Sequence, residues 1–344
     1  MFPKLTQILV IGLETTAVTQ TLVAMHPSRL AEMTRFPSWD PKPHILDPSG
    51  RRLFEELARR AQAILSDKRC HPECIAITMP GSIQGTHMLS RCSRLGVIRP
   101  LDVGTLLHDL GLPKIFLLRD VDCLAVGETD NAIHQPVTQS DYVYLFVDEG
   151  VGSSIFISGR SYRGAGHAGP IGRLIVEPDG AYNPAFRSYG PLEVFVGRPS
   201  LSQNLVNQFL TEAGKHGITK SSPFRNALNA AVTGDPTSLP YEIMKLGIEE
   251  GDPLAITVFD RAAHYLGLAI SSLIIILNPP MIILAGGIIT HFPSLALAAQ
   301  NYARRYSWEH GWNTTQFALG KAGRDHQYVG AAKLAYRLLT DHTA

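Results

Sequence analysis

Residues 114–128, KIFLLRDVDCLAVGE, contain the clearest indication of the fold. The first five, Lys114 to Leu118, are rich in large apolar side chains, which predicts a short buried strand. An acidic residue, Asp120, follows almost directly, and acidic residues are favoured at the start of a helix. We therefore expect a helix from about Asp120, and a strand that passes at once into a helix is typical of layered α/β folds.

Elements of the same kind extend in both directions from this junction. Before it, the sequence predicts a strand meander followed by alternating helices and strands, at 7–13, 19–25, 29–36, 50–67, 75–79 and 101–110. After a polar stretch at 137–141 the pattern restarts, with predicted elements at 142–147, 153–158, 174–177, 200–277, 281–284, 288–306, 316–319 and 328–340. The order ββ(β)αβαβα thus occurs twice, with helices inserted in the second copy. This predicts two related α/β lobes with a cleft between them.

The composition is that of a globular protein without a strong charge bias. Of the 344 residues, 45% are hydrophobic and 18% charged, and 31 Lys and Arg against 30 Asp and Glu give a net charge of +1. We therefore expect neither a nucleic-acid nor a membrane partner. Residues 1–25 lack a signal-peptide pattern, and Asn278-Pro279-Pro280 interrupts the most apolar stretch, so a cytoplasmic protein is predicted.

The cysteines do not suggest a disulfide framework. They stand at Cys70, Cys74, Cys92 and Cys123, which is too few and too irregular for a chain of this length. Free thiols in a reducing compartment are expected. Cys70 and Cys74 flank a histidine, but a single CxxxC without a second pair of ligands is a weak metal motif, and no metal is predicted there.

Six short motifs occur in the order found in one known family. They are MPG at 79–81, RDVDCLAVGE at 119–128, EGVG at 149–152, YRGAGH at 162–167, NPPMIILAGG at 278–287 and VGAA at 329–332. Together they resemble the ROK family of sugar kinases and sugar-responsive repressors. The resemblance implies two actin-like, hexokinase-like (ribonuclease H-like) lobes. They would span 1–130, joined by helix 328–340, and 131–325.

Asp120 matches the catalytic position of that family. There the resemblance implies a base that takes the proton of the sugar hydroxyl during attack on the γ-phosphate of ATP. The alternative is a structural role, because an Asp at a strand-to-helix turn can cap the first turn of the helix. Both interpretations remain open from the sequence.

The nucleotide motifs depart from the family pattern. The first phosphate loop, D-I-G-G-T in the family, aligns with residues 14–18, where Glu14 keeps a carboxylate but Val18 lacks the hydroxyl. The second keeps Gly150 and Gly152 but has acidic residues at 148 and 149, and an acid facing the site would repel phosphate. Because alternate residues of a strand lie on opposite faces, at most one of the two should face in, and both could point away. Gly286 and Gly287 match the adenosine segment. The resemblance implies ATP and Mg²⁺ only if these loops still function.

The sugar and zinc motifs are altered as well. The family motif G-E-I-G-H aligns with residues 169–173, which places Pro170 at the sugar-binding Glu and Arg173 at the His shared by sugar and zinc. All three cysteines of the zinc signature are absent from 184–193, so no zinc is expected. Glu193 remains, and it matches a carboxylate that contacts sugar hydroxyls in the family.

Arginine stands at three positions that the family fills with other groups. Arg94 and Arg119 replace Asn residues, and Arg173 replaces His. Because arginine binds carboxylates and phosphates with paired donors, the ligand could be a sugar phosphate or sugar acid. Alternatively, Arg173 pairs with Glu193 or Glu177 in place of zinc, and Arg119 points away from Asp120.

Three functions follow from these departures. The first is a catalytically degraded ROK-like protein that binds a sugar or sugar-derived ligand and has a regulatory role. The second is an active ATP-dependent sugar kinase with Asp120 as base. The third is a transcriptional regulator that acts through a partner, because the first strand near residue 7 leaves no room for a helix-turn-helix ahead of it. A homodimer paired through the second lobe is expected in each case.

Overall fold

The computed structural model describes residues 5–26, 29–45, 47–129, 140–216, 221–321 and 323–340. Contacts divide the chain into two compact units. Unit 1 comprises Met1–Thr138, Ser161–Ala168 and Ala322–Ala344, and unit 2 comprises Gln139–Arg160 and Gly169–Lys321. The predicted lobe boundary at 130/131 lies outside the described residues.

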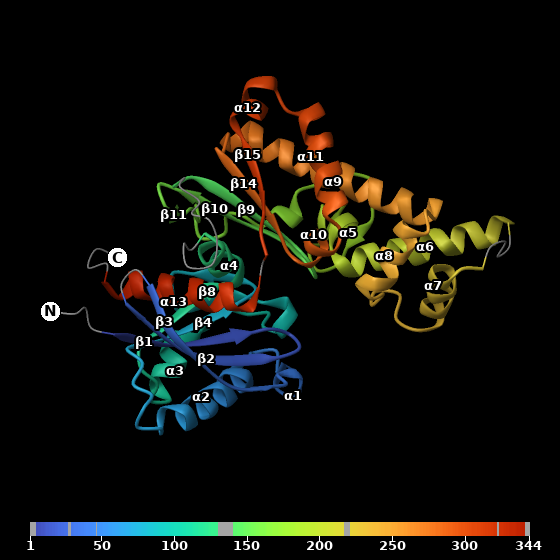
Figure 1. Cartoon of the computed structure of the whole chain (residues 1–344). Helices are drawn as coiled ribbons and strands as arrows, with labels where there is room; N and C mark the ends of the chain where they lie inside the picture. The colour runs from blue at the N-terminus through green and yellow to red at the C-terminus, as the bar shows by residue number, and fades with distance from the viewer. Residues whose placement is uncertain are drawn as a thin grey trace. The chain divides into compact units, whose positions relative to one another are not determined.

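Unit 1 is built on a five-stranded mixed sheet with the order β3-β2-β1-β4-β8 (Figure 1). The strands are β1 (Thr6–Leu13), β2 (Val18–His26), β3 (Arg29–Trp39), β4 (Cys74–Met79) and β8 (Ile115–Arg119). The meander β1–β2–β3 is antiparallel, whereas β4 and β8 add in parallel beside β1. A smaller sheet contains β5 (Ser82–Gln84), β6 (Met88–Arg91) and β7 (Leu101–Asp102), with the short 3₁₀ helix η1 (Ser93–Leu95) between the last two.

Helices cover both faces of the large sheet because its central strands are apolar on both faces. Leu9 and Ile11 pack into one core with α2 (Arg51–Leu65) and α3 (Val103–Asp109). Ile8 and Val10 alternate with them and face a second core, which includes residues of α4 (Asp120–Glu128) and α13 (Arg324–Thr340). Helix α1 (Lys42–Ile45) is a single short turn.

Two glycines let α4 and α13 pack at unusually short range. A Cβ on Gly127 would lie 1.8 Å from the carbonyl oxygen of His326, and one on Gly330 would lie 1.8 Å from that of Cys123. No other residue fits at this crossing without moving the backbone. The contact fixes the helix whose first residue is Asp120.

Unit 2 contains a second five-stranded mixed sheet with the order β11-β10-β9-β14-β15. The strands are β9 (Tyr142–Val147), β10 (Val151–Ile157), β11 (Arg160–Ser161), β14 (Met281–Ala285) and β15 (Gln316–Leu319). Strands β9 and β10 form an antiparallel hairpin, and β14 and β15 add in parallel. The antiparallel start and parallel continuation repeat the pattern of unit 1.

The helices of unit 2 pack around α9 (Pro253–Leu277). Around it lie α5 (Glu193–Val196), α6 (Arg198–His216), α7 (Pro223–Thr233), α8 (Tyr241–Glu249), α10 (Gly287–His291), α11 (Pro293–Tyr306) and α12 (Glu309–Thr314). Within the described ranges, α9 is the one helix long and apolar enough to cross a membrane, by length and composition only. Leu266, Ile270 and Ile274 are fully buried in the core of unit 2, which accounts for this apolarity.

Most predicted elements are confirmed, with two corrections. Residues 174–177 do not form a strand: after the 3₁₀ turn η2 (Ile171–Arg173), Ile175 makes one isolated bridge with Pro191. The predicted helix 288–306 is two helices, α10 and α11, because a proline at 293 cannot continue the hydrogen bonding of α10. By its contacts Ser161–Ala168 groups with unit 1, and the lobe boundaries taken from the sequence stay predictions.

Candidate functional site

Asp120 is the first residue of α4 and directly follows the end of β8. Its carboxylate accepts a hydrogen bond from the backbone N–H of Val121 at 2.7 Å. The N-cap residue is Arg119, so Asp120 does not occupy the capping position that the sequence left open. Burial raises the pKa of the Asp120 carboxyl, and the charge of Arg94 acts in the opposite direction. A raised pKa suits a group that accepts a proton near neutral pH.

Arg94 lies close enough to Asp120 for its charge to act on that carboxyl. It belongs to η1, is exposed, and makes no ion pair in the part of the chain that the structure describes. The buried thiol of Cys92 lies near both groups, and burial raises its pKa to about 11. Arg94 and Asp120 are therefore a neighbouring cation and acceptor within unit 1.

Arg119 points into a buried charge cluster. Its guanidinium binds both carboxylate oxygens of Asp122, at 2.6 and 3.1 Å, and donates to the carbonyl of Ala168 at 2.6 Å. Asp122 is fully buried and also accepts from Arg163 at 2.7 Å. In this Asp122 cluster (Arg119, Asp122 and Arg163), both arginines bind the same carboxylate. The cluster thereby attaches Ser161–Ala168 to α4.

The first phosphate-loop position forms the turn between β1 and β2. The backbone N–H of Glu14 donates to the carbonyl of Ala17 at 3.0 Å and closes the turn. The Glu14 carboxylate lies 3.5 Å from a guanidinium nitrogen of Arg324, at the start of α13. Val18 is fully buried in the core. The carboxylate retained at this loop thus faces an arginine of the same unit.

The second phosphate-loop position is the tight turn between β9 and β10. The Asp148 carboxylate accepts a hydrogen bond from the hydroxyl of Tyr241, the first residue of α8. The Glu149 carboxylate forms an ion pair with Arg198, the first residue of α6. The two neighbouring acids therefore have different partners within unit 2.

The glycines predicted to bind nucleotide lie beside this turn. Gly286 has a φ of 105°, and a Cβ there would lie 2.3 Å from the carbonyl oxygen of Val147. A Cβ on Gly287 would lie 2.4 Å from the hydroxyl oxygen of Tyr241. Around Gly152, by contrast, nothing lies within 4 Å of the Cβ position. Gly150, in the turn itself, accepts at its carbonyl from the backbone N–H of Asp148 at 3.0 Å.

The predicted sugar-binding residues of unit 2 have structural contacts. A carboxylate oxygen of Glu193 accepts from the backbone N–H of Val151 at 2.9 Å. Arg173 is exposed, and its guanidinium lies 4.2 Å from the ring centroid of Phe186. Glu177 binds Arg261 and Tyr265 instead. The structure therefore shows neither of the ion pairs that the sequence offered Arg173, and its cation packs on an aromatic ring.

A hairpin stands where the family has its zinc motif. Its strands are β12 (Tyr182–Asn183) and β13 (Ser188–Tyr189), and the rings of Tyr182 and Tyr189 contact each other in a tilted arrangement, with centroids 4.9 Å apart. The Asn183 side chain accepts from two backbone N–H groups of the turn. Among the described residues no cluster of three or more potential metal ligands occurs, and all four cysteines are buried free thiols.

We expect chelation to leave this hairpin intact. Structural zinc contributes directly to folding, so a zinc-dependent hairpin would lose stability on metal removal. Incubation with EDTA should leave the melting temperature unchanged, and metal analysis should find less than one zinc per chain. A melting temperature that falls with EDTA and recovers with Zn²⁺ would contradict this.

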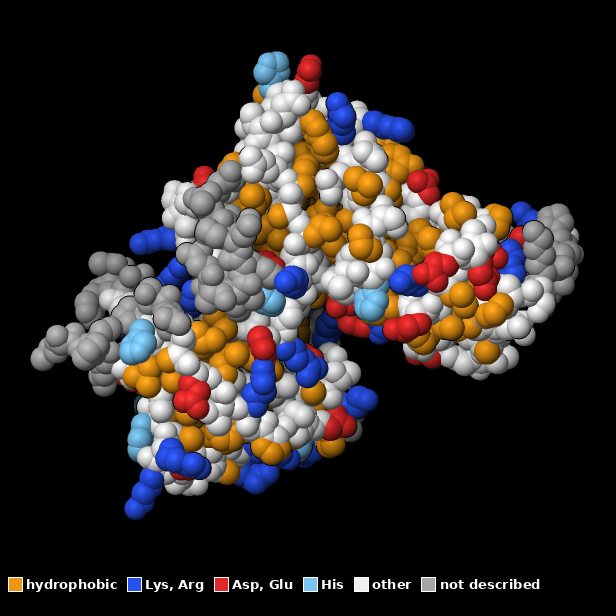
Figure 2. Space-filling view, in the orientation of Figure 1, with side chains coloured by type: hydrophobic (Ala, Val, Ile, Leu, Met, Phe, Trp, Pro, Cys, Tyr) orange, Lys and Arg blue, Asp and Glu red, His pale blue; other side chains and the backbone are white. Residues whose placement is uncertain are grey.

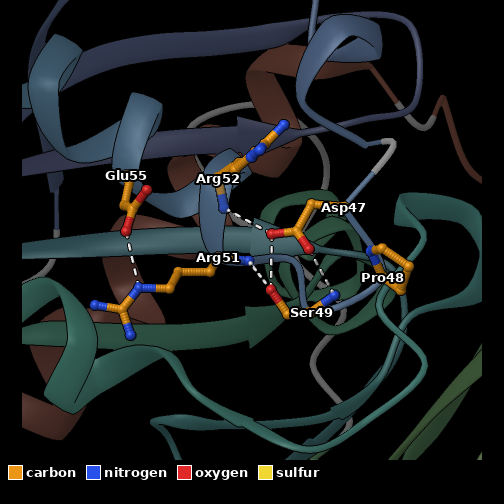
Figure 3. A pocket seen from close by; sticks show the side chains of 6 residues that line it. All are labelled: Asp47, Pro48, Ser49, Arg51, Arg52 and Glu55. Atoms are coloured by element: carbon orange, nitrogen blue, oxygen red, sulfur yellow. Dashed lines mark hydrogen bonds and ion pairs between the residues drawn. The ribbon is translucent and has the colours of Figure 1, made fainter.

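A surface pocket of about 400 Å³ lies at the start of α2 (Figure 3). Its lining residues are Asp47, Pro48, Ser49, Arg51, Arg52 and Glu55. Arg51 binds Glu55 at 2.8 Å, and Asp47 accepts from the backbone of Ser49 and Arg52. None of the residues predicted to bind ligand lines this pocket, and its acids Asp47 and Glu55 already bind neighbouring residues of the pocket wall.

Comparison with known proteins identifies the family. The model of the ROK family matches residues 55–337, most of the chain. The chain belongs to the ROK family. The uncharacterized protein YphH of Escherichia coli K12 is 30% identical over 248 residues, covering 68% of this chain and 55% of that protein. A glucokinase of Halalkalibacterium halodurans is 24% identical over 54% of this chain and 53% of its own length. The chain thus spans about half the length of these relatives.

Solved structures confirm the actin-like fold. A ROK hexokinase from Thermus thermophilus has a TM-score of 0.71 at 21% identity, covering 98% of this chain and all of that one. A ROK family transcriptional regulator, a homolog of the E. coli MLC protein, has a TM-score of 0.75 at 19% identity, covering 97% of this chain and 79% of that one. Kinases and a regulator therefore share the fold of this ROK family member.

The sequence did not identify the side chains that bind the phosphate-loop acids. Tyr241 and Arg198 lie in the helical insertion of unit 2, where no motif draws attention to them. Arg324 lies 310 residues after its partner Glu14. No motif drew attention to Asp122 either, and its spacing of three residues from Arg119 was the available signal.

Proposed function

We propose that this ROK family member binds a sugar or sugar-derived ligand without phosphorylating it, and that it has a regulatory role. One observation carries the proposal: each carboxylate at the two phosphate-loop positions is engaged by its own unit. Glu14 faces Arg324, Asp148 binds Tyr241 and Glu149 binds Arg198. To hold Mg²⁺, each of these acids must first give up its partner in the protein.

The residues at these positions do not fit a Mg²⁺–ATP complex. Phosphate loops bind through backbone N–H groups that glycines leave accessible, and Mg²⁺ keeps several of its own waters while one or two carboxylates bind it. Here Thr16 and Ala17 add side chains to the first loop, and Val18 is buried in the core. Release of Glu14 or Glu149 would also leave Arg324 or Arg198 without its partner.

The ligand side of unit 1 supports a sugar-derived ligand. Asp120 offers an acceptor of raised pKa for a hydroxyl, and Arg94 lies nearby without an ion pair in the described chain. Arginine binds carboxylate or phosphate with two parallel hydrogen bonds. We therefore favour Arg94 over Arg119 as the anion-binding residue, because Arg119 already binds Asp122. A sugar acid or sugar phosphate fits this arrangement.

A thermal-shift panel tests the proposed ligand class. Glucose, N-acetylmannosamine, gluconate and glucose 6-phosphate would be compared at one concentration, with and without Mg²⁺–ATP. The acidic or phosphorylated sugars should raise the melting temperature, because a ligand that binds only the folded state stabilises it. The shift should be lost in Arg94→Ala and Asp120→Asn, and a coupled assay for ADP should show no phosphoryl transfer.

Arg99→Ala serves as the matched control, because Arg99 is an exposed arginine of the same unit that was not assigned to the site. It should leave the shift unchanged. Stabilisation by neutral sugars alone would remove the anionic ligand from the proposal. ADP release that depends on sugar and is abolished by Asp120→Asn would establish the kinase alternative, which the retention of Asp120 favours.

The assembly and location of the protein stay predictions. Hydrophobic side chains are exposed on the face of unit 2 seen in Figure 2. Ile276 of α9 is 77% exposed and Leu297 of α11 is 61% exposed, which supports pairing with a second copy. Regulation through a partner protein and a cytoplasmic location likewise rest on the sequence.

A further inference from the structure

Tyr241 lies where three parts of the unit 2 fold meet: the β9–β10 turn, the start of α8 and the Gly286–Gly287 step into α10. Its hydroxyl donates to Asp148. Its ring stacks on His291 of α10, with centroids 4.2 Å apart and planes 9° apart. The hydroxyl is therefore held by a hydrogen bond, and the face of the ring by an aromatic stack.

Further contacts enclose the same ring. The Arg198 guanidinium lies 5.7 Å from the centroid of Tyr241 while it pairs with Glu149. The backbone N–H of Arg198 donates to the carbonyl of Asp148 at 2.8 Å. Burial and the bond to Asp148 both raise the pKa of the Tyr241 hydroxyl, so it is protonated and donates at neutral pH. Tyr241, Asp148, Glu149 and Arg198 form one cluster, here called the tyrosine cluster.

The tyrosine cluster occupies the space beside Gly287. A glycine at the start of a helix allows another group to approach the backbone closely, because it has no Cβ. At Gly287 the position of a Cβ is 2.4 Å from the Tyr241 hydroxyl oxygen and 2.8 Å from a carboxylate oxygen of Asp148. The close approach is therefore made by the protein's own tyrosine and carboxylate.

We propose that Tyr241 is a specificity-determining residue that occupies the space beside Gly287 and so excludes nucleotide from unit 2. This deepens the proposed function, on which it rests, by naming the side chain responsible for nucleotide exclusion. A nucleotide bound at Gly287 must displace the hydroxyl of Tyr241, and its phosphates would then meet the uncompensated charge of Asp148. Removal of the ring alone opens space, whereas removal of the ring and the charge together also removes repulsion.

Isothermal titration with Mg²⁺–ATP and Mg²⁺–ADP tests this on the full chain. The variants are Tyr241→Ala, Asp148→Asn and the double variant Tyr241→Ala/Asp148→Asn. Tyr302→Ala is the matched control, because Tyr302 is another tyrosine of unit 2 whose hydroxyl binds an aspartate, Asp260, away from the glycines. Melting temperatures establish that each variant is folded before titration, and Tyr241→Val replaces the alanine variant should that one not fold.

The wild type and Tyr302→Ala should show no saturable binding below the millimolar range. The double variant should bind at least about tenfold more tightly, a gain of 1.4 kcal/mol. A folded double variant that binds no better than the wild type overturns the role of Tyr241 and leaves the proposed function standing. Micromolar binding by the wild type overturns both. Failure of the sugar panel alone removes the proposed ligand but not the exclusion of nucleotide.

Discussion

Replacement of Gly330 by valine is expected to lower the free energy of unfolding by about 3 kcal/mol or more, because the new side chain overpacks a helix crossing. A Cβ at this position would lie 1.8 Å from the carbonyl oxygen of Cys123 and 2.7 Å from the backbone nitrogen of Gly127. Both neighbours are backbone atoms of α4, so relief requires α4 and α13 to separate. Urea unfolding followed by circular dichroism measures the loss.

Gly214 provides the matched control for this substitution. It lies in α6, is exposed, and has nothing within 4 Å of its Cβ position. Gly214→Val should be neutral or stabilise by less than about 1 kcal/mol, because valine favours helix slightly more than glycine does and restricts the unfolded chain. Equal losses at the two positions would show that helix propensity, and not the close crossing, determines the effect at Gly330.

This crossing also bears on the ligand site. Asp120 begins α4, and α13 packs along α4 through Gly127 and Gly330. A milder substitution, Gly330→Ala, that leaves the protein folded should therefore weaken the sugar-dependent thermal shift as well as stability. The position of Asp120 depends on residues more than 200 positions away in the sequence, which no local pattern reveals.

Local patterns predicted the fold well wherever an element is both apolar and bounded by turn residues. The strand Tyr142–Val147 was predicted with the bounds that it has, because its residues are almost all buried. The prediction at 174–177 was wrong because apolar side chains alone do not provide a neighbouring strand. Ile175 finds one bridge to Pro191, and Leu192 donates to Leu174, but no ladder forms.

The candidate site was predictable in its positions but not in its contacts. Glu14 and the acids at 148–149 lie in turns between strands, and Asp120 is the first residue of α4. Their partners could not be predicted, because Tyr241 is 93 residues from Asp148 and Arg324 is 310 from Glu14. The sequence predicted only that an acid facing the site at 148–149 would repel phosphate. The structure shows in addition that each of these acids, and Glu14, binds a side chain of its own unit.

The second large effect is expected at Asp122. Asp122→Ala should lower the free energy of unfolding by about 3–5 kcal/mol, because loss of one partner leaves buried charge uncompensated. Asp122 is fully buried and receives three hydrogen bonds from Arg119 and Arg163. Arg119 itself is 8% exposed, so water cannot replace the lost carboxylate around it. Urea unfolding again measures the change.

A double substitution separates charge from packing in this cluster. Arg119→Asn/Asp122→Asn removes both members of the pair and should be more stable than Asp122→Ala, because no buried arginine at 119 then lacks a partner. Glu55→Ala is the control: its pair with Arg51 is exposed on both sides, so the loss of stability should stay below about 1 kcal/mol.

If the double variant is instead as unstable as Asp122→Ala, the cluster stabilises unit 1 through its hydrogen bonds to Ser161–Ala168. In that case the bond from Arg119 to the carbonyl of Ala168 is its main contribution, and Arg119→Asn alone should reproduce the whole loss.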